Sequence, residues 1–219
     1  MDKKALNRYI KELEKIPTAS LSDALDKKGV KGYLSYEVKP IFPTKRIVGQ
    51  AVTIKDVLTK EVVTPLPALE VIDKAKPGDI IVRAVEDGNA KDIALWGGLM
   101  SLAAKKKGIK GAVLDGGVRD ILEAKAISFS IFAKSITPVT SVGRTKVVEI
   151  NSSITIDGVN INPGDLIVGD NDGVVVIPIN LVEDVIALAK EIDSLEKQES
   201  RELEKGKSIV EVIKKYARV

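Results

Sequence analysis

The densest group of residues that could do chemistry lies in two segments, Trp96-Gly-Gly-Leu-Met100 and Gly111-Ala-Val-Leu-Asp-Gly-Gly-Val-Arg-Asp120. The second segment predicts a strand, a glycine turn and a helix N-terminus that carries Arg119 and Asp120. A guanidinium stabilises a developing oxyanion, and a carboxylate holds a hard cation. Amides at the start of a helix near Gly97 favour a carboxylate or phosphate. Together these features predict a site for a 2-oxo acid, with its carboxylate on helix amides and its keto oxygen between a metal ion and Arg119.

Each of these features also has a purely structural alternative. An Arg-Asp pair at a helix start is often a cap or a surface salt bridge, and Gly97-Gly98 can serve close helix packing. Asp115-Gly-Gly117 by itself is typical of a generic turn. Asp170-Asn-Asp-Gly173 resembles part of a calcium loop but lacks the downstream glutamate at the right spacing, so a tight turn is the better interpretation.

The chain has no cysteine and no histidine among its 219 residues. Their absence excludes disulfides, Cys/His zinc sites, thiol nucleophiles and a Ser-His-Asp triad. Any bound metal must have oxygen ligands, which favours Mg²⁺ or Mn²⁺ over zinc. Any acid or base must be a carboxylate, lysine, tyrosine or water.

The overall charge and hydropathy exclude two further classes of partner. The net charge of +3 comes from 34 basic and 31 acidic residues mixed along the chain, without a basic stripe, so we expect no nucleic-acid binding. No apolar run reaches the roughly 18 residues of a membrane span, and the first residues contain no apolar signal region. We therefore expect a cytoplasmic protein with no membrane contact. Abundant Lys and Glu with only two Gln resemble the surface of a hyperthermophile protein.

The N-terminal two thirds of the chain alternate between strand and helix patterns. A helix is expected over 2–15, followed by a second that opens with a capping box at Ser20-Leu-Ser-Asp23 and ends at Lys28. Strands are predicted over 48–55, 79–85, 111–114 and 128–133, helices over 67–75, 95–107 and 118–126, and a loop at Asp87-Gly-Asn89. This alternation predicts an α/β fold with some parallel pairing.

The pattern of the remaining third predicts short strands joined by turns, followed by charged helices. The strands are expected over 146–150, 153–156, 159–161, 166–169 and 174–177, and they predict an antiparallel β layer. Helices are expected over 180–205 and 208–216. We expect one domain over 1–219, with 179–219 as a helical extension. Residues 193–205 have too few apolar positions to hold a helix on their own core, so we expect them to dock on a neighbouring subunit.

Several motifs, in order along most of the chain, resemble the RraA-like family, which includes 4-hydroxy-4-methyl-2-oxoglutarate aldolases and regulators of ribonuclease activity. The segments that carry the resemblance are Ser22-Asp-Ala-Leu25, Pro40-Ile-Phe-Pro43, Gly49-Gln-Ala-Val-Thr53, Pro77-Gly-Asp79, Leu114-Asp-Gly-Gly-Val-Arg-Asp120, Val159-Asn-Ile-Asn-Pro-Gly-Asp165 and Gly169-Asp-Asn-Asp-Gly-Val-Val-Val-Ile-Pro178. The resemblance implies a layered αββα fold with a mixed sheet. It also implies a homotrimer or a hexamer of two trimers, with active sites between subunits.

By resemblance, the chain is a lyase that cleaves 4-hydroxy-2-oxo acids or decarboxylates oxaloacetate through a pyruvate enolate, with Mg²⁺ or Mn²⁺ as cofactor. Arg119 contacts the substrate oxygen, and Asp120 binds the metal, partly through water. A glutamate of a neighbouring subunit's C-terminal helix completes the site; Glu196 is the first choice and Glu199 the second. The amides expected to hold the substrate carboxylate belong to Gly97, Gly98, Leu99 and Met100.

The chain departs from the family pattern at one position. Aldolase members carry an acidic residue 21 positions before the arginine, and here that position is Gly98. Loss of an acid/base group typically lowers a rate by about 10²–10⁴-fold, and decarboxylation depends on it less than aldol cleavage. The alternative function is a non-catalytic regulator that binds a ribonuclease or another protein. A methyltransferase, another label used in this family, is disfavoured because no G-x-G-x-G loop follows a strand.

Overall fold

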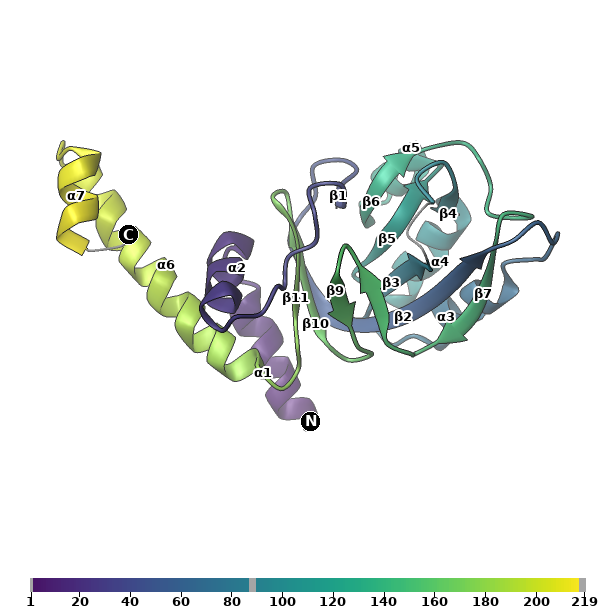
Figure 1. The fold of residues 1–219 in the computed structure, drawn as a ribbon, viewed down its shortest axis with the longest axis horizontal. Coiled ribbons are helices and arrows are strands. Elements are labelled where there is room, and N and C mark those ends of the chain that lie inside the picture. Colours follow the sequence, from purple (N-terminus) through teal and green to yellow (C-terminus); the bar gives the residue numbers. More distant parts are fainter. Residues whose placement is uncertain (1, 87–89, 217–219) are drawn as a thin grey trace.

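The core of the chain is a nine-stranded mixed sheet (Figure 1). The structure is a computed structural model that describes residues 2–86 and 90–216, so the expected loop Asp87-Gly-Asn89 lies outside the described residues. The nine strands of this sheet are β1 (Lys39–Pro40), β2 (Ile47–Leu58), β3 (Ile80–Val85), β4 (Ala94–Trp96), β5 (Gly111–Val118), β6 (Ser130–Ile136), β7 (Thr145–Ile150), β10 (Leu166–Asp170) and β11 (Gly173–Ile177). A separate pair consists of β8 (Ile154–Ile156) and β9 (Val159–Ile161).

The centre of the sheet is parallel and its margins are antiparallel. The order is β1-β6-β5-β3-β2-β10-β11, with β4 added beside β5 and β7 beside β2. Strands β2, β3, β5 and β6 pair in parallel, with Val82 opposite Thr53 and Val113. Every residue of β3 and β5 is buried, as expected of parallel strands covered on both faces.

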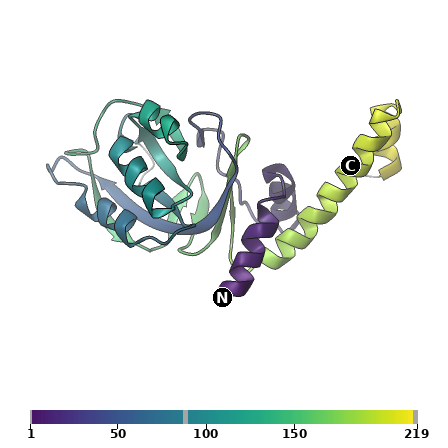
Figure 2. The same ribbon diagram turned by 180° about the vertical axis from the view of Figure 1, so that it is seen from behind.

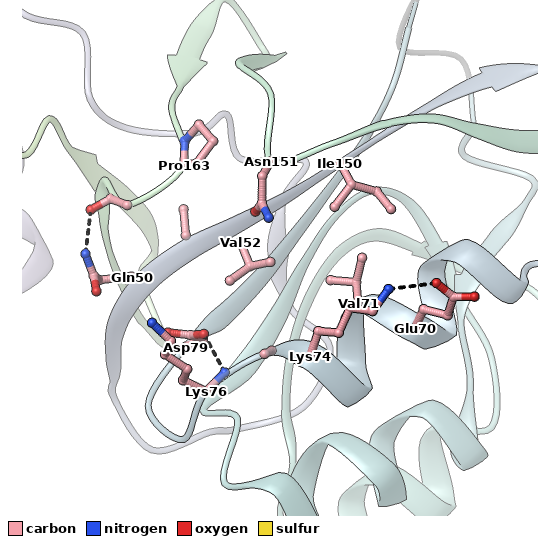
Figure 3. Close-up of a pocket in the computed structure, with 13 residues that line it drawn as sticks. Gln50, Val52, Glu70, Val71, Lys74, Lys76, Asp79, Ile150, Asn151 and Pro163 are labelled. Carbon is pink, nitrogen blue, oxygen red and sulfur yellow. Dashed lines mark hydrogen bonds and ion pairs between the residues drawn. The ribbon is translucent and has the colours of Figure 1, made fainter.

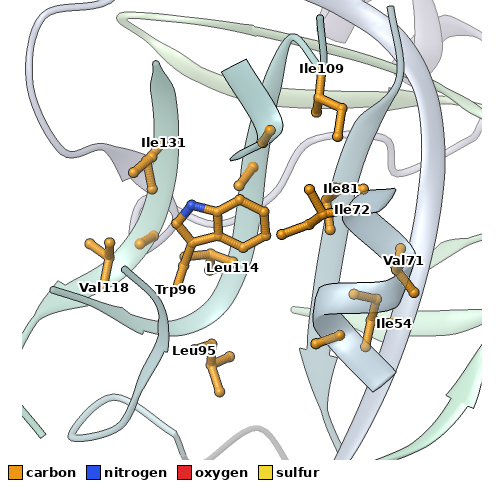
Figure 4. Packing of buried hydrophobic residues seen from close by; sticks show 14 of the residues in the cluster. Ile54, Val71, Ile72, Ile81, Leu95, Trp96, Ile109, Leu114, Val118 and Ile131 are labelled. Carbon is orange, nitrogen blue, oxygen red and sulfur yellow. The ribbon is translucent and has the colours of Figure 1, made fainter. Parts of the chain in front are cut away.

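Three helices cover one face of the sheet: α3 (Leu66–Lys74), α4 (Gly98–Lys107) and α5 (Ile121–Ala126). Figure 2 shows helices of this region lying across the strands. The apolar cluster between them surrounds Trp96, whose ring stacks on Phe129 at a centroid distance of 6.0 Å (Figure 4). On the other face, the two-stranded β8–β9 sheet contributes Ile154 and Ile161 to a second cluster with Val82 and Val113.

The terminal helices form a third packed region at the β10–β11 end. Helices α1 (Lys3–Leu13) and α2 (Thr18–Lys27) pack with the first half of α6 (Val182–Glu204), mainly through Leu, Ile, Val and Ala side chains. The second half of α6 projects away from the sheet and carries α7 (Ile209–Tyr216) folded back on it (Figures 1 and 2). None of the described helices is both long and apolar enough to cross a bilayer.

The predicted α/β class, mixed sheet, antiparallel layer and C-terminal helices are confirmed, with local corrections. The expected separate antiparallel layer is only the β8–β9 pair, because β7, β10 and β11 hydrogen-bond to the main sheet. The two-residue strand β1 was not predicted. The predicted tight turn at 170–173 is confirmed as the β10–β11 hairpin, in which Asp170 pairs with Gly173.

Three predicted helix starts were wrong. The helix expected from Leu95 begins at Gly98, because Ala94–Trp96 pairs with β5 as a strand. The helix expected from Val118 begins at Ile121, because Asp115-Gly-Gly117 continues β5 through a bulge and is not a turn. The second helix begins at Thr18, ahead of its expected capping box, and its first residue follows Pro17.

Candidate functional site

The predicted residues of the glycine segment and the Arg-Asp pair line one hollow of about 260 Å³. It lies where β5 ends and α4 begins, between the start of α3 and the segment 140–142. Its lining includes Gly97, Gly98, Leu99, Met100, Arg119 and Asp120. The structure therefore brings together, within one chain, all the candidate site residues except the glutamate expected from a neighbour.

Asp120 is held in an uncommon backbone conformation next to α4. Its φ of 56° and ψ of 42° are left-handed, which aspartate adopts more readily than most residues. Its Oδ2 accepts a hydrogen bond from the Gly98 amide at 3.0 Å and lies 3.6 Å from Arg119 Nε. Both side chains are partly exposed. The left-handed turn thus aims the carboxylate at the start of α4 and keeps it accessible.

The glycines at the start of α4 allow this close approach. A Cβ at Gly97 would lie 2.8 Å from Asp120 Oδ2, and one at Gly98 would lie 3.1 Å from Asp120 Cβ. The first amides of a helix have no intrahelical acceptor, and in α4 these include the amides of Leu99 and Met100. Ser101 anchors the turn, since its Oγ donates to Gly97 O and accepts from Trp96 Nε1, both at 3.0 Å.

The purely structural roles that the sequence left open, a helix cap at Asp120 and close packing at Gly97 and Gly98, are both present in the fold. Asp120 caps α4 rather than its own helix α5, for which no side-chain cap is formed. Gly97 and Gly98 do permit close packing. These contacts occupy only one oxygen of the carboxylate, so they are compatible with a ligand at the same place.

The floor of the hollow contains a buried ion pair that the sequence did not indicate. Arg83, 1% exposed, donates from Nε to Asp56 Oδ2 and from Nη2 to Asp56 Oδ1, both at 2.7 Å, and from Nη1 to Leu95 O. Such a bidentate pair is strong and geometrically fixed. The only sequence signal was a charged residue in the apolar strand 80–85. The pair holds β2, β3 and β4 together beneath the site.

Asp120 can supply one carboxylate ligand to a hard cation. With Oδ2 bound to the Gly98 amide, Oδ1 is left to ligate, and Mg²⁺ accepts a single carboxylate with several waters. The described residues of one chain contain no group of three or more acidic side chains arranged for a metal. Further protein ligands would have to come from another subunit.

Glu196 and Glu199 lie on the second half of α6, away from Asp120 of the same chain. Glu196 is partly exposed and Glu199 is buried near the α6–α7 end. Figure 1 shows this end projecting from the side of the molecule opposite α5. A single chain therefore does not bring either glutamate to the hollow, and their expected role stays a prediction about a neighbouring subunit.

A second cluster of charges lies on the opposite face of the sheet, beside a cavity of about 530 Å³. Lys134 Nζ lies 2.5 Å from Asp115 Oδ1 and 2.8 Å from Asp157 Oδ1. Asp157 Oδ2 also accepts from Ser35 N and Oγ, at 3.2 and 2.7 Å. These contacts tie β5 and β6 to the turn between β8 and β9. Asp115 thus belongs to this cluster rather than to a turn beside Arg119.

The environment of this cluster shifts the pKa of each member. Burial raises the pKa of Asp115, and Lys134 offsets it only in part. Burial would lower the pKa of Lys134, but the hydrogen bonds to Asp115 and Asp157 outweigh it and the pKa is raised. Burial also opposes the charge of Asp157, yet Lys134 and Ser35 lower its pKa. Lys134 is therefore held protonated, which argues against its acting as a nucleophile or Schiff-base lysine.

A third hollow, of about 320 Å³, opens where β3 begins (Figure 3). The charged cluster of Asp115, Lys134 and Asp157 lies at the opposite end of β3. Asp79 accepts the Lys76 amide at 2.7 Å, and burial raises the pKa of Asp79. Lys74 pairs with Glu70 at 2.9 Å, and Gln50 donates to Gly164 O at 3.3 Å. The first contact closes the turn before β3, the second lies within α3, and the third joins β2 to the turn before β10. None of the predicted site residues lies there.

Comparison with known proteins places the chain among relatives of one family. A family model described as RraA-like, Aldolase/RraA, matches residues 18–176. A protein of Halalkalibacterium halodurans, named as a provisional 4-hydroxy-4-methyl-2-oxoglutarate aldolase, is 38% identical over 182 residues, covering 83% of this chain and 82% of the relative.

Solved structures agree with the sequence relatives. An uncharacterised protein from Pseudomonas syringae superposes with a TM-score of 0.83 at 31% identity, covering 94% of this chain and 96% of that one. Streptomyces coelicolor RraAS2 is described as an unusual member of the RNase ES inhibitor RraA protein family. It superposes with a TM-score of 0.80 at 26% identity, covering 89% of this chain and 98% of that one. By fold, by sequence and by the segment that the family model covers, this chain belongs to the RraA-like family.

Proposed function

We propose that the protein is a divalent-metal-dependent carbon–carbon lyase that acts on a 2-oxo acid. The observation that carries the proposal is the placement of Arg119 and Asp120 against the amide end of α4, in a hollow kept open by Gly97 and Gly98. The name of the Halalkalibacterium halodurans relative supports the same reaction class.

The substrate carboxylate would lie on the amides of Leu99 and Met100, where the helix end favours negative charge. Arg119 would donate to the keto oxygen at C2. Asp120 Oδ1 would hold Mg²⁺ or Mn²⁺, which when bound withdraws electron density from the substrate. The planar guanidinium is suited to an oxygen that gains charge as the bond breaks.

In aldol cleavage, a base removes the proton of the C4 hydroxyl, the C3–C4 bond breaks, and its electron pair moves to C2–O as an enolate. Protonation at C3 then gives pyruvate and a second carbonyl product. In oxaloacetate decarboxylation, the bond to the departing carboxylate breaks instead and CO₂ leaves. Arg119 stabilises the enolate oxygen in both reactions. Only aldol cleavage needs the hydroxyl proton removed, and Gly98 supplies no carboxylate base for that step.

We also propose that a second copy of the chain completes the site. The surface around Asp120 exposes large apolar side chains, with Leu99 85%, Leu122 76% and Ile136 56% exposed. Apolar side chains grouped at one place are typical of an interaction surface. The projecting end of α6, with Glu196 and Glu199, is the segment expected to cover this surface in a trimer or hexamer.

The proposed activity is tested by assaying oxaloacetate and several 4-hydroxy-2-oxo acids with Mg²⁺, with Mn²⁺ and with a chelator. We expect pyruvate to form with either metal and turnover to stop with the chelator. Pyruvate formation that persists with the chelator would contradict metal dependence. No turnover of any 2-oxo acid would contradict the lyase.

The second candidate function is a non-catalytic regulator of a ribonuclease. It is favoured by the relative described as a member of an RNase ES inhibitor family and by Gly98 in the position of the family acid. It predicts that the protein lowers ribonuclease activity in a purified assay while it leaves 2-oxo acids unchanged.

A further inference from the structure

The buried pair of Asp56 and Arg83 reaches the candidate site through one backbone carbonyl. Arg83 Nη1 donates to Leu95 O, while Nε and Nη2 hold both carboxylate oxygens of Asp56 at 2.7 Å. Leu95 lies in β4, two residues before Gly97, which is the N-cap of α4. The guanidinium therefore links the centre of the sheet to the strand that leads into the amide end of α4.

The pairing of β4 with β5 leaves this link to be made by a side chain. While β4 advances two residues, from Ala94 to Trp96, its partner β5 advances only one. Leu95 is the extra residue at this shift in register, and such a residue has no partner in the ladder. Because Leu95 is 1% exposed, its carbonyl needs a donor from within the protein, and Arg83 supplies it.

The next two carbonyls of this segment are anchored to the site itself. Trp96 O accepts the Arg119 amide at 3.0 Å. Gly97 O accepts the amide and the hydroxyl of Ser101, both at 3.0 Å. Together with the Leu95 carbonyl, three successive carbonyls therefore join the buried ion pair, the backbone of Arg119 and the first turn of α4. A shift of β4 would move the α4 amides relative to Arg119.

Stability alone is a poor explanation for a buried ion pair of this kind. The cost of removing two charges from water can exceed the gain from their attraction, and apolar residues of similar volume often stabilise a fold as well or better. Resting on the proposed function, we propose that Asp56 and Arg83 are positioning residues. Through Leu95 and β4, the ion pair sets the α4 amides and Arg119 at the separation that the substrate carboxylate and keto oxygen require.

The test replaces the pair with apolar residues in the double variant Asp56→Val/Arg83→Met. This variant leaves no charge of the pair buried without its partner, so it should melt at or near the wild-type temperature. Its kcat/KM for the 2-oxo acid that the wild type turns over should fall about 10²-fold, because a displacement of about 1 Å has an effect of this size on alignment. Arg83→Lys keeps the charge opposite Asp56 but loses the planar fork, so kcat/KM should fall at least about tenfold.

A second measurement needs no turnover. The Gly98 amide, which donates to Asp120 Oδ2, should exchange its hydrogen at least about tenfold faster in both variants than in the wild type without added substrate. The matched control is Arg46→Met, which breaks another partly buried pair, with Asp170 at the β10–β11 end. Its kcat/KM and its Gly98 exchange should stay at wild-type values.

The outcomes separate this inference from the proposed function. Wild-type kcat/KM or wild-type Gly98 exchange in the double variant, at wild-type thermal stability, overturns the inference and leaves the lyase in place. If the double variant melts well below the wild type, Arg83→Lys decides, and wild-type kcat/KM in Arg83→Lys overturns the inference. A wild type that turns over no 2-oxo acid overturns the proposed function and the catalytic role of the pair, whereas faster Gly98 exchange still supports the link between the pair and α4.

Discussion

Asp120 Oδ2 accepts the Gly98 amide at 3.0 Å, so the carboxylate after β5 caps the helix that precedes β5 in the chain. The two residues lie 22 positions apart, and the contact depends on the left-handed backbone of Asp120 and on the missing side chain at position 98. This contact holds the Asp120 carboxylate at the amide end of α4, where we propose that the metal ion and the substrate carboxylate bind.

Asp120→Asn should abolish metal-dependent turnover while the fold is kept. Asparagine tolerates the left-handed backbone, and its side-chain oxygen can still accept the Gly98 amide. The loss of charge removes the carboxylate that the hollow of each chain is proposed to supply to the metal. Mn²⁺ affinity, measured by calorimetry or by the magnetic resonance of bound Mn²⁺, should fall at least about tenfold. Asp73→Asn, on the exposed surface of α3, is the matched control. Wild-type metal affinity in Asp120→Asn would remove this residue from the metal site.

Arg119→Lys should lower kcat by about 10²-fold or more although the charge is kept. A lysine ammonium is a point charge and cannot reproduce the planar guanidinium at the enolate oxygen. The Arg119–Asp120 pair is partly exposed at 3.6 Å, so the free energy of unfolding should change by less than about 1 kcal/mol. Steady-state kinetics and thermal unfolding check both statements. Near-normal kcat would leave Arg119 with the structural role of a salt bridge alone.

Gly98→Asp should increase aldol cleavage more than oxaloacetate decarboxylation. Both reactions share Arg119, but only aldol cleavage must move the hydroxyl proton. The new Cβ would lie 3.1 Å from Asp120 Cβ and 3.4 Å from Glu123 Cβ, so some local shift is required. Gly98→Asn introduces the same crowding without the charge and is the control. Equal changes in both reactions with Gly98→Asp would show that the missing acid is not what limits aldol cleavage.

The chain should assemble as a trimer or a hexamer through the surface around Leu99 and Leu122. Leu122→Glu places a charge on an exposed apolar position, so it should weaken assembly without unfolding the chain. Light scattering at micromolar protein concentration measures the oligomeric state of the wild type and of each variant. The matched control is Val62→Glu, since Val62 is similarly exposed but lies in the segment between β2 and α3 and not on α5 beside Asp120. A monomeric wild type would contradict the shared site.

Lys134→Met should lower the free energy of unfolding by about 3–5 kcal/mol at neutral pH, because Asp115 and Asp157 lose their buried partner. Lys74→Met, which breaks only the exposed pair with Glu70, should change it by less than about 0.5 kcal/mol. Because the pKa of Lys134 is raised in the folded state, its contribution is complete below its ordinary pKa and is lost as the pH rises above it. The difference between wild type and Lys134→Met should therefore shrink at strongly alkaline pH, measured by denaturant titration. A difference that does not depend on pH would assign the loss to packing alone.

The amino-acid sequence by itself determined the fold class and the residues around the candidate site. Local patterns of apolar residues specify β3 and β5, and the glycines and charges of the segments 96–100 and 111–120 indicate a ligand site near strand ends. Because the sequence has no histidine and no cysteine, the side-chain ligands of any bound metal are expected to be oxygen atoms. These properties depend on residue type and short spacing, which a sequence displays directly.

Only the tertiary structure decided which long-range partners these residues have. Asp115 looked like part of a turn, but β5 continues through it and its carboxylate faces Lys134 on the opposite side of the sheet from the hollow. Arg83 is a charge within an apolar strand, and its partner Asp56 lies on the neighbouring strand, 27 positions away in the chain. Register between strands and the left-handed turn at Asp120 arise from packing of segments distant in the chain, so no local pattern could specify them.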